Sequence, residues 1–98
     1  MTPLAQSDDT LLHAGREKAK GLASAIAGCL RHHGYAQVDA VGPHCVSNAV
    51  KAIAIARAYL KPSGFDLHCV PAFRVIPNRD RPGNELTQMV FDVRRVDG

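Results

Sequence analysis

The chain has 98 residues and a mass of 10.5 kDa, which is room for one domain around one hydrophobic core. Apolar residues make up 46% of it and charged residues 21%, so the composition excludes a disordered or collagen-like chain. Its 12 Lys and Arg against 9 Asp and Glu give a net charge of +3, which permits an anionic partner without requiring one.

The N-terminal residues and the cysteines predict the cellular compartment of the protein. Residues 1–9 are polar and predict a flexible leader rather than a signal peptide, so the domain is expected to span residues 10–98. No apolar run approaches the roughly 20 residues of a membrane helix. The 3 cysteines are odd in number and widely spaced, which favours reduced thiols. We therefore expect a cytoplasmic protein without a membrane partner, and association with the nucleoid is left open.

The first half of the domain predicts a strand followed by an amphipathic helix. Residues 10–14 are typical of a short strand. After a basic crossover, Leu22, Ile26 and Leu30 recur every four residues and form one apolar stripe, which predicts a helix lying on a core. Gly34 predicts the end of that helix, because glycine readily adopts the left-handed conformation of a helix C-terminus.

A second strand and a second helix follow. Residues 35–41 alternate apolar and polar side chains and predict a strand. Pro43 suits the first turn of the next helix, which is expected to end at about Leu60. Residues 49–56 are apolar nearly all round, with a thin polar stripe through Lys51. Such a helix needs cover on two sides, and in so small a chain a second subunit is a candidate for one of them.

The last third predicts a long β-hairpin. Residues 65–76 form its first strand, in which Pro71 indicates an edge position or a bulge. Residues 77–84 are rich in Pro, Asn, Gly and Arg and predict a basic, flexible tip, and residues 89–94 alternate in the returning strand. The order β-α-β-α-β-β predicts an α+β fold, a two-layer sandwich in which two helices cover one face of a mixed four-stranded sheet.

Three runs give the sequence a family resemblance. Residues 21–31 (GLASAIAGCLR), 48–57 (NAVKAIAIAR) and 69–73 (CVPAF), in this order and spacing, resemble the stage V sporulation protein S family. That family is similar in fold to the Alba nucleic-acid-binding proteins, whose topology matches the order predicted above. The resemblance implies a homodimer formed through the second helix and part of the sheet, nucleic-acid binding, and a role in bacterial sporulation or developmental regulation.

Seven basic side chains form the candidate nucleic-acid site. In Alba-like proteins the first crossover, the second helix and the hairpin arms carry the nucleic-acid face, and a two-fold axis doubles it. The corresponding residues here are Arg16, Lys18, Lys20, Lys51, Arg74, Arg79 and Arg81. We expect them to contact phosphates of DNA or RNA in a sequence-tolerant, salt-dependent way, because the chain has no Trp and few aromatic residues for stacking on bases. The alternative for these charges is an ordinary solvated surface.

Other candidate sites are weaker. Arg57 is expected to be structural, pairing with a carboxylate or a dimer partner, so Lys51 is the better candidate ligand on the second helix. Cys29, His32 and His33 have helical spacing, but the chain lacks a C-x-x-C pair, and Cys29 is expected in the core; no metal or other cofactor is predicted.

Catalysis is not expected either. The adjacent pairs His44–Cys45 and His68–Cys69 show no sign of an activated thiol, and the two Glu residues, Glu17 and Glu85, do not suggest an acid–base pair. The competing hypothesis is a dimeric protein–protein adaptor on the same scaffold without nucleic-acid binding, which the modest net charge favours.

Overall fold

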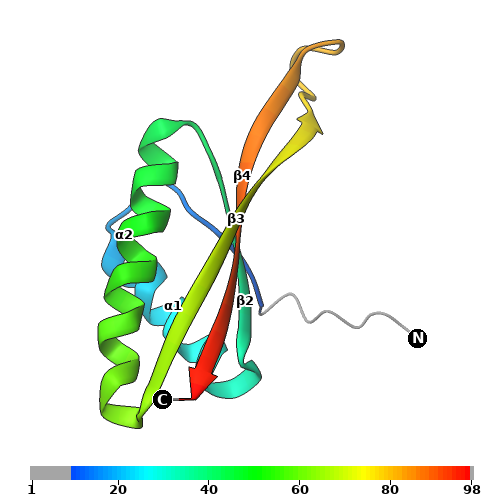
Figure 1. The fold of residues 1–98 in the computed structure, drawn as a ribbon. Helices are drawn as coiled ribbons and strands as arrows, with labels where there is room; N and C mark the ends of the chain where they lie inside the picture. The colour runs from blue at the N-terminus through cyan, green and yellow to red at the C-terminus, as the bar shows by residue number, and fades with distance from the viewer. Residues whose placement is uncertain (1–9, 98) are drawn as a thin grey trace, which may run out of the picture.

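The computed structural model describes residues 10–97 and contains the predicted elements. Their order is β1 (Leu11–His13), α1 (Ala19–His33), β2 (Tyr35–Val41), α2 (Pro43–Leu60), the 3-10 turn η2 (Lys61–Ser63), β3 (Phe65–Pro77) and β4 (Glu85–Asp97). Both helices lie on one side of the sheet, and the β3–β4 hairpin extends beyond them (Figure 1). The predicted α+β two-layer fold is confirmed, while the predicted leader, residues 1–9, lies outside the described residues.

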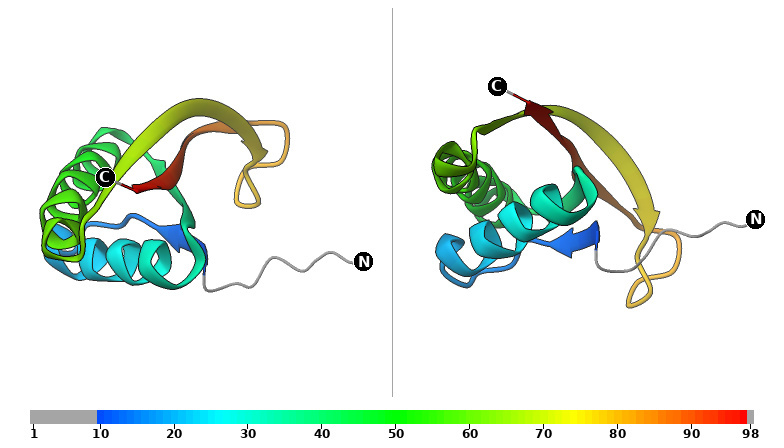
Figure 2. Two further views of the ribbon diagram at one scale, coloured as in Figure 1. Left: turned by 60° about the horizontal axis from the view of Figure 1, so that its bottom comes forward. Right: turned by 90° about the horizontal axis from the view of Figure 1, so that it is seen from below.

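The four strands form one mixed sheet in the order β1-β2-β4-β3. β1 pairs parallel to β2, and β4 pairs antiparallel to both β2 and β3. β3 therefore has a single neighbour, so Pro71 lies on an edge strand as predicted, where a residue without an N–H is tolerated. The hairpin arches away from the helices in both views of Figure 2.

The helix boundaries follow from local chemistry. Gly34 has φ +75° and its N–H donates to the carbonyl of Leu30 at 3.0 Å, which ends α1 at the predicted residue. α2 begins at Pro43, whose missing N–H would have had no partner in a first turn, and ends at Leu60 before η2. Within residues 10–97, neither helix is long and apolar enough to cross a membrane.

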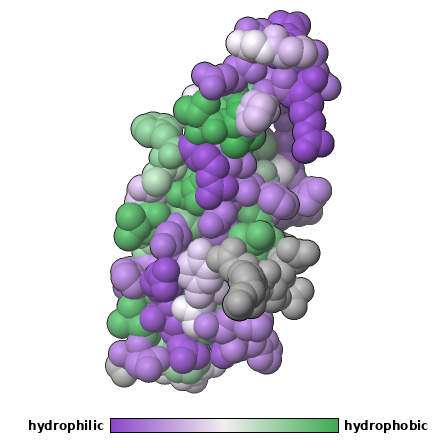
Figure 3. All heavy atoms as spheres, turned by 90° about the vertical axis from the view of Figure 1, so that its right-hand side faces the viewer, coloured by the Kyte–Doolittle hydropathy of each residue, from purple (hydrophilic) through white to green (hydrophobic). Residues whose placement is uncertain are grey.

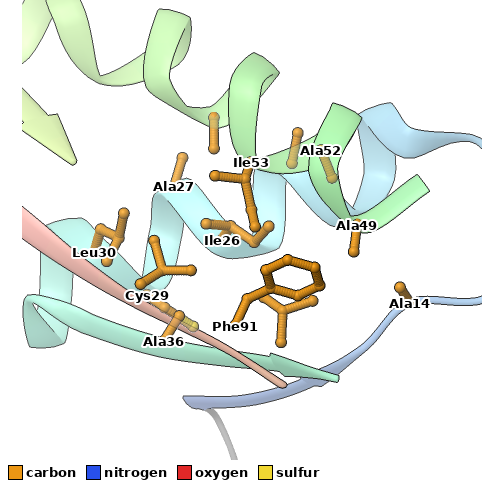
Figure 4. Packing of buried hydrophobic residues seen from close by; sticks show 14 of the residues in the cluster. Ala14, Ile26, Ala27, Cys29, Leu30, Ala36, Ala49, Ala52, Ile53 and Phe91 are labelled. Atoms are coloured by element: carbon orange, nitrogen blue, oxygen red, sulfur yellow. The ribbon is translucent and has the colours of Figure 1, made fainter. Parts of the chain in front are cut away.

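The core lies between the helices and the inner face of the sheet. Its largest fully buried side chains are Ile26, Leu30, Leu60, Val38 and Val93. Figure 4 shows Ile26 between Ile53 of α2 and Phe91 of β4. Cys29 is 8% exposed and belongs to this cluster, as expected.

The outer side of α2 has no cover within the described part of the chain. The side of α2 that packs on the core consists mainly of small side chains. Val50, Ala54 and Ala58, spaced four residues apart, are exposed on the outside. The sequence predicts that α2 is covered on two sides. In the single chain, one of these sides is exposed to solvent.

Candidate nucleic-acid interface

The seven predicted cations are all exposed, and they fall into two groups. The first, which we call the loop cluster, consists of Arg16, Lys18, Lys20 and Lys51. It lies in the loop before α1, in the first turn of α1 and on α2. The second group, the arm arginines, consists of Arg74, Arg79 and Arg81. It lies on β3 and in the turn between β3 and β4.

Asn48 of α2 brings the loop cluster together. Its Nδ2 donates to the carbonyl of Gly15 at 2.8 Å and to the carbonyl of Glu17 at 2.9 Å. The loop that carries Arg16 is thereby fastened to α2, and Lys51 lies one helical turn beyond Asn48 on the same side of α2. Asn48 was not predicted as a site residue from the sequence; the local signal for it is an amide beside an apolar stretch, where Asn is a poor helix former.

The N-terminus of α1 lies between Lys18 and Lys20 and adds to the positive potential of this cluster. No side chain within residues 10–97 caps the N-terminus of α1 or α2, and neither first turn contains an acidic residue. Unsatisfied N–H groups and the helix dipole favour negative charge at these ends. Lys18, the N-cap residue of α1, adds a full positive charge to the same end.

The arm arginines lie apart from the loop cluster. Arg74 lies opposite Gln88 in the register of β3 and β4. The preceding residue, Phe73, lies opposite Met89, which packs against the core. Because successive side chains of a strand point to opposite faces, Arg74 lies on the sheet face away from the helices. Arg79 and Arg81 lie at the far end of the hairpin, and the molecule is hydrophilic there (Figure 3).

Backbone hydrogen bonds shape the turn at the tip of the hairpin. The N–H of Asn78 donates to the carbonyl of Asn84 at 3.1 Å, and the N–H of Asn84 donates to the carbonyl of Arg81 at 3.0 Å. An open hollow of about 500 Å³ lies beside this turn and is lined in part by Arg79 and Glu85. The tip therefore has a defined backbone path, on which Asp80 and Glu85 accompany the two arginines.

Arg57 has the structural role that the sequence predicts. Its Nε and Nη2 donate to the two carboxylate oxygens of Asp66 at 2.6 and 3.0 Å, a bidentate ion pair between α2 and β3. Hydrogen bonds from Arg57 and from the N–H of Leu67 lower the pKa of Asp66 to about 2. This arginine is therefore occupied, in contrast to Lys51.

The lowered pKa makes a pH-dependent contribution to stability. A carboxyl group whose pKa is lower in the folded state stabilises the fold above its unfolded pKa, here 3.8, and loses that contribution as pH falls through about 2. We expect Asp66→Asn to be slightly less stable than the parent at neutral pH, with the two melting temperatures converging between about pH 4 and pH 2. Thermal melts of both proteins over this range test it, and parallel curves would contradict it.

Two further arginines secure the C-terminal end of α1. Arg95 Nη1 donates to the carbonyls of Leu30 and Arg31, both at 3.3 Å, and its guanidinium lies over the ring of Phe65 at 4.4 Å. Arg31 Nη2 donates to the carbonyl of Tyr59 at 2.9 Å, which joins the ends of the two helices. Arg95 therefore adds a second donor to the carbonyl of Leu30, which also accepts from the N–H of Gly34, and both arginines place a cation at the negative end of a helix dipole.

Arg94 is held on the outer face of the sheet. It lies 4.7 Å from the ring centre of Tyr35, and its Nε is 3.2 Å from Oδ1 of Asp92. Arg31, Arg57, Arg94 and Arg95, the engaged arginines, therefore all have protein partners. None of the seven predicted cations forms an ion pair with a residue between 10 and 97. The structure thus separates four engaged arginines from the exposed cations without an ion pair in this range, which are the seven predicted ones and Lys61.

The His and Cys residues do not form a site within the described chain. No group of three His, Cys, Asp or Glu side chains between residues 10 and 97 is arranged to hold a metal ion. Partial burial, and secondarily the charge of Asp92, raises the pKa of the Cys69 thiol. A nucleophilic cysteine needs the opposite shift. His13 Nδ1 lies 2.6 Å from Oδ1 of Asp39 across the β1–β2 pair, a contact that the sequence analysis missed.

Comparison with known proteins agrees with this architecture. The fold is that of the Alba class: Alba from Thermoplasma volcanium superposes with a TM-score of 0.61 at 14% identity, covering 87% of this chain and 99% of that one. At this identity the likeness concerns the fold alone. Residues 9–96 match the family described as stage V sporulation protein S. The chain belongs to that family, as the three sequence runs predicted.

Proposed function

We propose that this protein binds the phosphate backbone of DNA or RNA without catalysing a reaction, as a regulator in bacterial sporulation or development. One observation carries the proposal. The seven cations predicted for binding are exposed and unpaired within residues 10–97, whereas four other arginines are engaged in the fold. Available Lys and Arg side chains can form charge-assisted hydrogen bonds with phosphates, and such contacts account for most of the affinity of proteins for a nucleic-acid backbone.

A homodimer is part of the proposal. Val50 on the outside of α2 is 52% exposed, and Phe73 on the helix side of β3 is 77% exposed. A second copy seated on α2 and the hairpin would bury these side chains, and it would place two loop clusters on one assembly. Nucleic acid is present in the cytoplasm, so we propose that the dimer works there.

The adaptor hypothesis remains the second candidate because of the hairpin. Phe73 and Val75 lie on the same face of one edge strand and are both more than half exposed, as apolar side chains in protein–protein contact surfaces are. An apolar interface would respond little to salt, whereas phosphate contacts weaken steeply with it. Salt dependence therefore separates the two functions.

Substitution of two lysines, each removing one positive charge, tests the proposed function. Lys51→Ala removes a loop-cluster cation, and Lys61→Ala removes an exposed lysine outside both groups. We expect Lys51→Ala to weaken binding several-fold at about 0.1 M salt and to reduce the slope of log K against log salt by about 1 per protomer. Lys61→Ala is expected to leave the slope unchanged. Fluorescence anisotropy with single-stranded RNA measures both, and equal effects of the two variants would contradict an assigned phosphate site.

A further inference from the structure

The loop between β1 and α1 owes its shape to one side chain of α2. Ala14 is the last residue before the loop whose N–H bonds to β2, at 2.8 Å from the carbonyl of Asp39, and α1 begins at Ala19. Between these two anchors, the side chain of Asn48 binds two backbone carbonyls of the loop, those of Gly15 and Glu17. The two carbonyls flank Arg16, so the backbone on both sides of this cation is fixed.

A side-chain amide suits this position. Both partners are acceptors, so the group that faces them must supply two N–H donors from one atom, which the Nδ2 of asparagine does. A carboxylate would repel the two carbonyls, and a serine hydroxyl could serve only one of them. The contacts span 33 and 31 residues of sequence, so they join parts of the fold that α1 and β2 separate.

We infer that Asn48 is a positioning residue that holds the β1–α1 loop so that Arg16 and Lys18 face phosphates beside Lys51. This inference rests on the proposed function. A loop that is ordered before binding loses no further conformational entropy when the ligand binds. The affinity is therefore higher than for a loop that must become ordered on binding. The cations on either side of Glu17 would otherwise sample many directions, and the loop cluster would bind as separate charges.

The test compares Asn48→Ala with Ser47→Ala, an exposed neighbour on α2 with no bond to the loop. Alanine is a better helix former than asparagine, so α2 is expected to persist in both variants. The first readout needs no nucleic acid. Limited trypsin digestion, followed by mass spectrometry, reports cleavage after Arg16 and Lys18, and we expect it to be accelerated in Asn48→Ala only.

The second readout is the affinity for single-stranded RNA and DNA. We expect Asn48→Ala to bind roughly tenfold more weakly than the parent at low salt. In a background that already carries Arg16→Ala and Lys18→Ala, the same substitution is expected to change affinity little, because the residues it positions are gone. A merely structural role of Asn48 would lower affinity by the same factor in both backgrounds.

The outcomes separate this inference from the function on which it rests. If the parent binds nucleic acid and Asn48→Ala binds equally well, the positioning role is overturned and the proposed function stands. If the parent binds none, both are overturned, and faster cleavage in the variant would show that Asn48 fastens the loop for another purpose. Should Asn48→Ala fail to fold, Asn48→Ser keeps one donor, and we expect it to show intermediate cleavage and affinity.

Discussion

Replacing both tip arginines, Arg79→Ala with Arg81→Ala, is expected to weaken nucleic-acid binding by on the order of 10- to 100-fold at about 0.1 M salt. Each phosphate contact releases a counterion and contributes about 0.9 to the salt slope on duplex DNA, so two lost contacts remove nearly 2 from the slope per protomer. The loss should be similar for different sequences, because phosphate contacts carry no base information. Anisotropy titrations at several salt concentrations measure both quantities.

The control for this variant removes the same charge from the engaged set. Arg57→Ala combined with Arg94→Ala also lowers the net charge by two, but these side chains are bound to Asp66 and Asp92. We expect the control to change the salt slope little and to lower the melting temperature slightly. If the tip variant binds with unchanged affinity and slope, the arms do not contact the ligand.

Ile26→Ala is expected to cost about 2–5 kcal/mol of folding free energy. Ile26 is 0% exposed and lies where α1, α2 and the sheet meet, so its removal leaves a cavity that neighbours on three elements line (Figure 4). A domain of this size has a total stability of roughly 5–15 kcal/mol, so this one change removes a large share of it. Chemical denaturation of both proteins gives the difference.

The matched control on the same helix is Ser24→Ala, which changes an exposed residue two positions away. It is expected to alter the unfolding free energy by less than about 0.5 kcal/mol. A loss below about 1 kcal/mol for Ile26→Ala would mean that the core between the helices and the sheet is not packed as described.

Local patterns were sufficient to predict the fold. The four-residue repeat of Leu22, Ile26 and Leu30, the end of α1 at Gly34 and the start of α2 at Pro43 depend on interactions within a few residues, and each is confirmed. Pro71 predicted an edge position or a bulge, and the edge position of β3 is the one that the structure shows. These features are local, so the sequence was enough to place them.

The candidate site could be predicted only in part. The exposure of Lys51 followed from the polar stripe of α2, and the pairing of Arg57 with a carboxylate is one of the two outcomes expected for it. The contacts of Asn48 with the loop, and of Arg95 with the end of α1, span 33 and 65 residues. Such contacts depend on how distant elements pack, which no local pattern encodes.

The division between engaged and available cations has the same origin. In the sequence, Arg94 and Arg95 look as basic and as accessible as Arg79 and Arg81. Strand alternation already places Arg94 beside Asp92, but only the packing of distant elements brings Arg94 to Tyr35 and Arg95 to the end of α1. The net charge therefore does not indicate which cations of this protein are free to bind a ligand, whereas the position of each cation in the fold does.

The most direct test of the account is a fluorescence-anisotropy titration of the unmodified protein with single-stranded RNA, single-stranded DNA and duplex DNA, each at low and moderate salt. We expect the protein to bind at least one of these polymers, with an affinity on the order of micromolar at physiological salt that falls steeply as salt rises. Absence of binding to all three at low salt would contradict it, and the adaptor hypothesis would then take its place.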